Sequence, residues 1–347
     1  MNLNIISKHR AVIYGIAILY VVLFHASAIN DFDYSFGHKI LEPFKLFMDT
    51  GNVGVDIFLF MSGVSLYFSF TRNNDIAQFF VKRFWRIVPA VWIIFGWYWA
   101  LLYLVQSFAP DQFIPRILCV DFWLMTGDAS IWYVSLILFL YLLYPLIYAA
   151  LYGGKTGHTG VKCLILLAFV YAVVTIFWMR NPDFYKTIEI AITRIPVFIM
   201  GCYWGKLVFE KRTVSKAFIP LFFIAVFAFY GVLYPDVIHG PLRRFFYAVG
   251  GISLCYAIAL ICEFFDMLFK GEKPKSRFLY RFLAWTGGFT LELYVGHIMC
   301  NQAFHKFFDW YVDENLKVYL VMATFAFFLA FGVSKLVPVI QKKITGK

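Results

Sequence analysis

The residues of this sequence that could do chemistry are ionisable side chains inside apolar stretches. His25 lies in an apolar run that begins at Ala11, and Asp56 lies near the start of the next run. An ionisable group inside a bilayer costs roughly a few kcal/mol or more, so such groups mark functional sites by default. A carboxylate beside an imidazole fixes its tautomer and raises its basicity, which suits a general base. The alternative for His25 and Asp56 is a structural hydrogen bond between two helices.

Three further ionisable groups lie in later apolar runs. Arg194 and His297 fall at a depth similar to that of His25, and Asn301 shares the face of His297 because the two are one helical turn apart. Glu292 lies deeper and points away from His297. Any one of these groups could simply pair two helices, whereas several at one depth favour a polar cavity.

A basic segment and an aromatic segment could bind ligands. Arg83 and Arg86 are three residues apart on one helical face, and the planar fork of arginine suits phosphate. Anchoring at the cytoplasmic surface explains the same residues without a ligand. Trp132 and Tyr133 open another apolar run, where an interfacial aromatic belt is the simpler interpretation.

The composition decides which elements position these residues. Hydrophobic residues make up 62% and charged residues 15% of the 347, against about 25% charged in an average soluble domain. We therefore predict an all-α polytopic transmembrane bundle of about ten spans. The expected spans are 11–30, 51–71, 87–108, 131–152, 163–179, 190–208, 217–234, 244–265, 282–305 and 318–338. No linker divides the chain, which predicts a single integral-membrane domain over residues 1–347 without a fused soluble domain.

The charge pattern predicts the orientation. Most of the 31 lysines and arginines fall in segments that are cytoplasmic if both termini are cytoplasmic, so the net charge of +11 reflects the positive-inside rule rather than nucleic-acid binding. The first run could be mistaken for a signal peptide, but its cleavage signal at 26–28 is weak. The stretch Phe113–Met125 is expected to be re-entrant or interfacial on the outer side. The six cysteines lack metal-ligand spacing, and we expect them to be buried, with no bound metal.

Six motifs occur in the order typical of one family. They are Gly15–Ala17 followed by Val21–His25, the Gly54-Val55-Asp56 segment to Gly63, Arg83-x-x-Arg86 with Pro89, Trp132-Tyr133-Val134-Ser135 leading to Tyr144-Pro145, Arg194-Ile195-Pro196 with Gly201, and Thr290-x-Glu292 with His297. Together they resemble the acyltransferase 3 family of membrane acyltransferases. Many members have an arginine where this chain has Tyr14. Here the nearest arginine is Arg10, one turn earlier.

The resemblance implies transfer of an acyl group, usually acetyl, from cytoplasmic acyl-CoA to a hydroxyl of a cell-envelope or lipid-linked carbohydrate. His25 would be the general base, oriented by Asp56, and a covalent acyl-histidine relay is the second variant. The coenzyme would be bound by Arg83, Arg86 and Arg10. The acceptor side would be lined by Trp132, Tyr133, Arg194, Glu292 and His297. The implied location is the inner or plasma membrane, as a multi-pass protein.

Two other classes of protein remain open. A transporter or flippase of lipid-linked sugars also needs a polar cavity between helices, although no internal repeat is evident. A membrane scaffold or receptor would not need the buried histidine, aspartate and arginine. Thiol release from acetyl-CoA separates the enzyme from both. The acyl group, the acceptor sugar, the pathway and the oligomeric state are not readable from the sequence.

Overall fold

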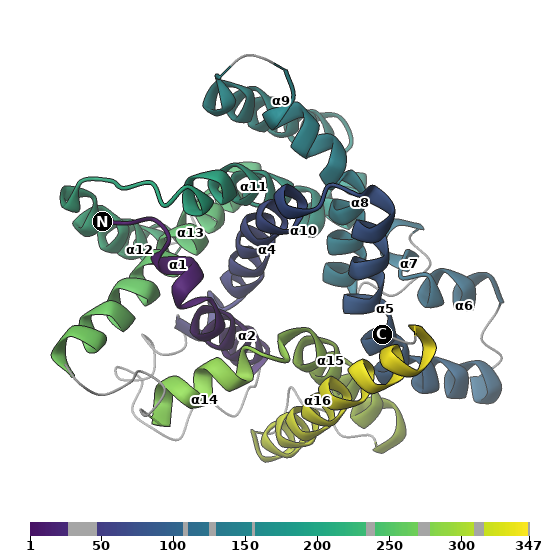
Figure 1. Ribbon diagram of the computed structural model, residues 1–347. Coiled ribbons are helices and arrows are strands. Elements are labelled where there is room, and N and C mark those ends of the chain that lie inside the picture. The colour runs from purple at the N-terminus through teal and green to yellow at the C-terminus, as the bar shows by residue number, and fades with distance from the viewer. Residues whose placement is uncertain are drawn as a thin grey trace. The chain divides into compact units, whose positions relative to one another are not determined.

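The computed structural model describes residues 1–26, 47–106, 110–124, 130–154, 157–233, 240–269, 278–308 and 316–345. Its regular elements over these ranges are helices, apart from one isolated bridge between Asn2 and Thr213 (Figure 1). The prediction of an all-α fold is confirmed.

The helices follow the apolar runs of the sequence. Their bounds are α1 Ile5–Lys8, α2 Arg10–Ala26, α4 Val53–Arg72, α5 Ile76–Gln106, α6 Pro110–Ile117, α7 Asp121–Leu124, α8 Trp132–Tyr152, α9 Thr159–Arg180, α10 Pro182–Ile192, α11 Ile195–Phe209, α12 Ile219–Leu233 after a short 3₁₀ turn, α13 Gly240–Leu268, α14 Phe278–Thr286, α15 Thr290–Phe308 and α16 Leu316–Thr345.

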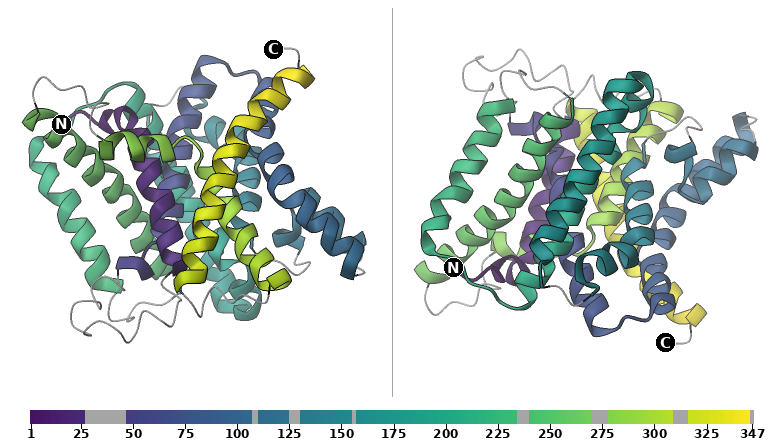
Figure 2. Two further views of the ribbon diagram at one scale, coloured as in Figure 1. Left: turned by 90° about the horizontal axis from the view of Figure 1, so that it is seen from below. Right: turned by 90° about the horizontal axis from the view of Figure 1, so that it is seen from above.

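The helices divide into two compact units, each built from segments that are distant in sequence. The first unit comprises Met1–Ala17, Asn52–Phe79 and Phe139–Gly288, and the second comprises Ile18–Gly51, Phe80–Leu138 and Phe289–Lys347. In the first unit α4 packs on α11 and α13, and α12 packs on α13; in the second, α15 packs on α16 (Figure 2). The single integral-membrane domain stays a prediction.

Seven helical stretches in the described ranges are long and apolar enough to cross a membrane, and α2 and α12 are shorter apolar helices. Each predicted span has a helical counterpart. The number of spans and the side of each terminus stay predictions, because α15, which carries Glu292, His297 and His305, is not among these seven stretches. The helices also differ in how much of them is buried inside the protein. Of the most apolar stretch of each helix, 78% is buried in α4 but only 11% in α9.

Two predicted spans are broken helices. The span expected at 190–208 consists of α10 and α11, which are separated at Thr193 and Arg194, with a proline in the first turn of α11. Proline lacks the N–H that a continuous helix would use, so it favours a new helix start. The span expected at 282–305 consists of α14 and α15, separated by Gly287 and Gly288. Both breaks place candidate residues at the start of a helix.

Glycines bring the α4 and α11 backbones together in the first unit. A Cβ atom on Gly63 would lie 2.6 Å from the carbonyl oxygen of Phe198, and one on Gly201 would collide with the carbonyl oxygen of Phe60. Gly205 meets Tyr67 in the same way, at 2.5 Å from its Cβ. Glycines four residues apart allow close helix approach in membranes. These glycines therefore permit the close packing of α4 on α11.

Three further predictions concern the start of α5, the segment 113–125 and the cysteines. α5 begins at Ile76 rather than near residue 87, so Arg83 and Arg86 lie inside the helix. The segment predicted to be re-entrant or interfacial contains the short helices α6 and α7, and Met125 lies outside the described residues. The six cysteines are free and buried, as expected.

Candidate functional site

Two histidines from opposite ends of the chain meet in the second unit. His25 lies in the last turn of α2, and His297 lies in the middle of α15. Their ring centroids are 5.1 Å apart, and the ring planes are inclined by 51°. His297 is buried and His25 is half-buried. The sequence expected both at one depth, and the structure brings them into contact.

The hydrogen bond of His297 defines its tautomer. Its Nδ1 lies 2.9 Å from the carbonyl oxygen of Leu293, one turn earlier in α15. A carbonyl oxygen only accepts, so Nδ1 carries the hydrogen and Nε2 carries the lone pair. Among the described residues, Nε2 is buried and has no hydrogen-bond partner. A buried nitrogen lone pair without a partner is costly in a folded protein, and it is the feature that a hydroxyl group of a substrate would satisfy.

Aromatic side chains extend the histidine pair toward α8. The Tyr294 ring packs edge-on against His297 at 5.7 Å, and Tyr133 packs on Tyr294 at 5.1 Å. Trp132 adjoins Tyr133 at 6.2 Å. The predicted acceptor-side residues Trp132, Tyr133 and His297 therefore gather in one region of the second unit. Sequence reasoning missed the role of Tyr294, although its position one turn before His297 places both on one helical face.

Glu292 occupies the first turn of α15, directly after the helix break. It is buried, and among the described residues its Oε2 has no hydrogen-bond partner. The charge of Arg86 on α5 acts on this carboxylate. Arg86 itself is exposed and Arg83 is half-buried. Arg86, which is predicted to bind the coenzyme, therefore interacts electrostatically with Glu292, which is predicted to line the acceptor side.

Asp56 lies in the first unit, where it pairs with arginine. Its Oδ2 is 3.4 Å from Nε of Arg194, and both side chains are at most 2% exposed. Arg194 Nη1 also donates to the carbonyl oxygen of Ile190 at 2.7 Å, because the break between α10 and α11 leaves that oxygen accessible. Asp56 and His25 belong to different units, so the predicted orientation of His25 by Asp56 stays a prediction.

A second arginine completes the charge network around Asp56. Arg244 on α13 acts electrostatically on Asp56, and its Nη2 lies 3.9 Å from Glu189 Oε1. Gly251, two turns along α13, allows this approach because a Cβ there would lie 3.1 Å from the Asp56 Cβ. Sequence reasoning missed Arg244. The available signal was its position at the outer end of the span expected at 244–265, because the positive-inside rule does not explain an arginine on that side.

Tyr14 stands where the resemblance expects an arginine. Its ring stacks on Phe58 of α4 at 5.9 Å, so it serves packing within the first unit. Arg10 is the first residue of α2 and is exposed. Its predicted contact with the coenzyme stays a prediction.

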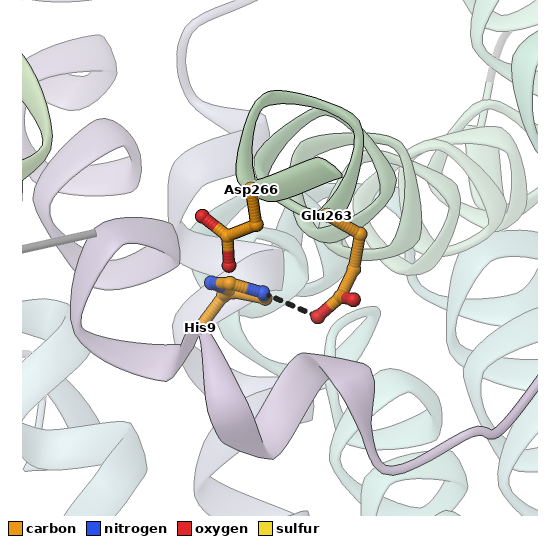
Figure 3. A group of neighbouring side chains, drawn as sticks. All are labelled: His9, Glu263 and Asp266. Carbon is orange, nitrogen blue, oxygen red and sulfur yellow. Dashed lines mark hydrogen bonds and ion pairs between the residues drawn. The ribbon is translucent and has the colours of Figure 1, made fainter. Parts of the chain in front are cut away.

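One cluster in the first unit has the side chains of a metal site. Ligand atoms of His9, Glu263 and Asp266 lie within 4.8 Å of one another (Figure 3). The ammonium of Lys8 lies 2.5 Å from Glu263 and 3.4 Å from Asp266, which supplies the positive charge that a cation would bring. Burial lowers the pKa of Lys8, but the hydrogen bond and charge of Glu263 outweigh it, so the pKa is raised and Lys8 is cationic. We therefore interpret the cluster as an ion-pair network. The expected absence of a metal stays a prediction.

The helical fold, the apolar spans and the buried polar groups define a multi-pass membrane protein. The model of the acyltransferase 3 family, described as an acyltransferase domain, matches residues 13–337, nearly the whole chain. The chain belongs to this family and is a membrane acyltransferase, as the order of its motifs predicted. No curated protein and no solved structure gives a significant match to the chain.

Proposed function

We propose that this acyltransferase moves an acetyl group from cytoplasmic acetyl-CoA to a hydroxyl of a cell-envelope or lipid-linked carbohydrate, in the inner or plasma membrane. The observation that carries the proposal is the contact between His25 and His297, with a buried Nε2 lone pair on His297. A general base works in a site that excludes bulk water, and His25, the proposed base, is half-buried beside His297.

The transfer step needs a base that takes the proton of the acceptor hydroxyl. His25 takes the proton of the acceptor hydroxyl as the hydroxyl oxygen attacks the thioester carbonyl. The tetrahedral intermediate expels the CoA thiolate, which receives the proton from His25, so the products are the ester and free CoA thiol. In the second variant, His25 is itself acylated before the acceptor arrives. The Nε2 lone pair of His297 accepts a hydrogen bond from a neighbouring hydroxyl of the acceptor sugar, which leaves the attacking hydroxyl free to donate its proton to His25.

The remaining predicted residues take binding roles. Arg83 and Arg86 bind the phosphates of the coenzyme through their guanidinium groups, with Arg10 as a further cation. Trp132 and Tyr133 offer flat apolar surfaces for the sugar. Glu292 accepts hydrogen bonds from the ligand, Arg194 lines the acceptor side, and Asp56 orients His25.

A transporter of lipid-linked sugars is the second candidate. Its supporting observation is the pair of interrupted helices, α10–α11 and α14–α15, because broken helices often form the substrate sites of transporters. Transport requires no consumption of acetyl-CoA.

The release of CoA thiol separates the two candidates. Purified full-length protein in vesicles is given acetyl-CoA and a carbohydrate acceptor, and free thiol is measured over time. The enzyme releases thiol in proportion to acylated acceptor. If the protein moves a lipid-linked sugar across the vesicle membrane without releasing thiol, the transporter candidate replaces the enzyme.

A further inference from the structure

An apolar groove lies in the first unit between α2, α13 and α14. Its volume is about 350 Å³. Val12 and Ile16 line it from α2, Ile261 and Phe265 from α13, and Leu283 from α14. This volume falls in the range of roughly 300–1,000 Å³ that is typical of sites for small molecules.

The shape of the groove fits a chain rather than a compact ligand. Its lining along α13 runs from Ile258 to Phe269. Eleven helical steps of about 1.5 Å give a length of about 16 Å. Because the lining is aliphatic and aromatic, water gains no hydrogen bonds there, and an alkyl chain is the occupant that a bilayer offers.

Tyr280 connects the apolar groove to a neighbouring polar cluster, which we call its polar end. Tyr280 lines the groove, and its hydroxyl lies 3.2 Å from Nδ1 of His9. Nε2 of His9 lies 2.8 Å from Glu263, as Figure 3 shows. Glu263 and Asp266 belong to the same stretch of α13 as Phe265, so the carboxylates flank the apolar lining.

The polar end suits a headgroup that carries both signs of charge. Glu263 and Asp266 already hold an ammonium, that of Lys8, which shows that the carboxylate pair binds a primary ammonium group. The Lys8 side chain is 52% exposed and flexible, so its ammonium can move to a neighbouring phosphate. A zwitterionic headgroup would then satisfy all three side chains.

We propose that this groove binds one acyl chain of phosphatidylethanolamine, with the headgroup ammonium on Glu263 and Asp266 and the phosphate beside Lys8. Phosphatidylcholine lacks the N–H donors that the carboxylates need, and phosphatidylglycerol lacks the cation. The site is separate from the histidine pair, and the inference does not depend on acyl transfer.

Lipid competition on the unmodified protein tests the headgroup. The purified full-length chain is incubated with equal amounts of phosphatidylethanolamine, phosphatidylcholine and phosphatidylglycerol, and the retained lipid is counted by native mass spectrometry. We expect phosphatidylethanolamine to be retained about tenfold or more over the other two, since charge-assisted hydrogen bonds distinguish the headgroups. Equal retention of all three, or preference for phosphatidylglycerol, overturns the proposal.

Two variants test the parts of the site separately. Ile261→Trp fills the groove and should lose the retained lipid, whereas Ile224→Trp, on an exposed part of α12 outside the groove, should keep it. The double variant Glu263→Gln with Asp266→Asn should retain lipid without preferring phosphatidylethanolamine over phosphatidylcholine. Unchanged retention by Ile261→Trp, or an unchanged preference in the double variant, contradicts the site. If a variant does not fold, the competition on the unmodified chain decides alone.

Discussion

At the scale of single residues, the proposed mechanism depends on the protonation of two imidazoles. His297 donates its Nδ1 hydrogen to the backbone of its own helix, and its ring contacts the ring of His25. Two protonated rings at this distance would repel each other. The proposed mechanism therefore uses His25 as a neutral base with His297 neutral beside it.

Replacing His25 tests the assignment of the base. We expect His25→Ala to lower kcat by about 100- to 10,000-fold, which is the usual contribution of a general base. His158→Ala, which changes an exposed histidine before α9, should leave kcat unchanged. Rates of thiol release are compared at saturating acetyl-CoA, and size-exclusion profiles confirm folding. Normal transfer by His25→Ala would falsify the base assignment.

The pair of Asp56 and Arg194 is a different kind of site, since both charges are buried. Removing one partner leaves an uncompensated charge, so Arg194→Met should destabilise the protein by about 3 kcal/mol or more. The double variant Asp56→Leu with Arg194→Met should recover most of this loss. Thermal unfolding in detergent measures both.

A surface pair provides the control for this experiment. Lys186→Met breaks an exposed contact of 3.9 Å with Asp183, which should cost under about 1 kcal/mol. If Arg194→Met proves as mild as Lys186→Met, the buried pair does not stabilise the first unit.

At the scale of elements, helix breaks decide which groups become available. The break before α15 leaves Glu292 in the first turn of a helix, with Tyr294 and His297 following on the same element. The break before α11 places Arg194 at the start of that helix. A continuous helix would have satisfied its own backbone and left fewer exposed polar groups for a ligand.

The α5 helix offers a test of coenzyme binding. Arg83→Ala and Arg86→Ala should each raise the KM for acetyl-CoA about tenfold, since each removes a charge-assisted bond to phosphate. Lys82→Ala is the control, because Lys82 is exposed beside them. Initial rates over a range of acetyl-CoA concentrations give the KM values.

The electrostatic interaction with Glu292 supplies a competing explanation for Arg86. If Arg86 only neutralises the buried Glu292, then adding Glu292→Gln to Arg86→Ala should restore the KM. If Arg86 binds phosphate, the double variant keeps the raised KM. Restoration would remove Arg86 from the coenzyme site.

At the scale of the whole molecule, the bilayer acts as the solvent that makes this composition foldable. Many large apolar side chains remain exposed on the described helices, including Leu164 and Phe169 on α9 and Phe328 on α16. Such a surface would aggregate in water, whereas lipid covers it without penalty.

The orientation of the chain can be measured because its native cysteines are buried. A membrane-impermeant thiol reagent should label Asp183→Cys, in a segment predicted to be outside, and spare Asn74→Cys in intact cells. Both positions are exposed, so accessibility does not differ between them. Lysed cells provide the labelling control at Asn74→Cys. The opposite pattern would invert the predicted topology.

The sequence by itself determined that this chain is a multi-pass helical membrane acyltransferase. Hydropathy and helix-forming runs are local properties, so the helices appeared close to their predicted positions, and the order of six motifs identified the family. The exceptions were the early start of α5 at Ile76 and the breaks at Thr193–Arg194 and Gly287–Gly288. The sequence shows the proline and the two glycines at these breaks, but each lies in a run apolar enough to be interpreted as one continuous span.

Only the tertiary structure decided which side chains meet. The partners His25 and His297, Asp56 and Arg194, and Arg86 and Glu292 are far apart in the chain. Their contacts depend on how each helix is rotated and packed, which is fixed by close approaches such as that of Gly201 to Phe60. A rotation by one residue, about 100°, would turn any of these groups away from its partner, and the apolar pattern of a helix surrounded by lipid and protein does not specify that angle.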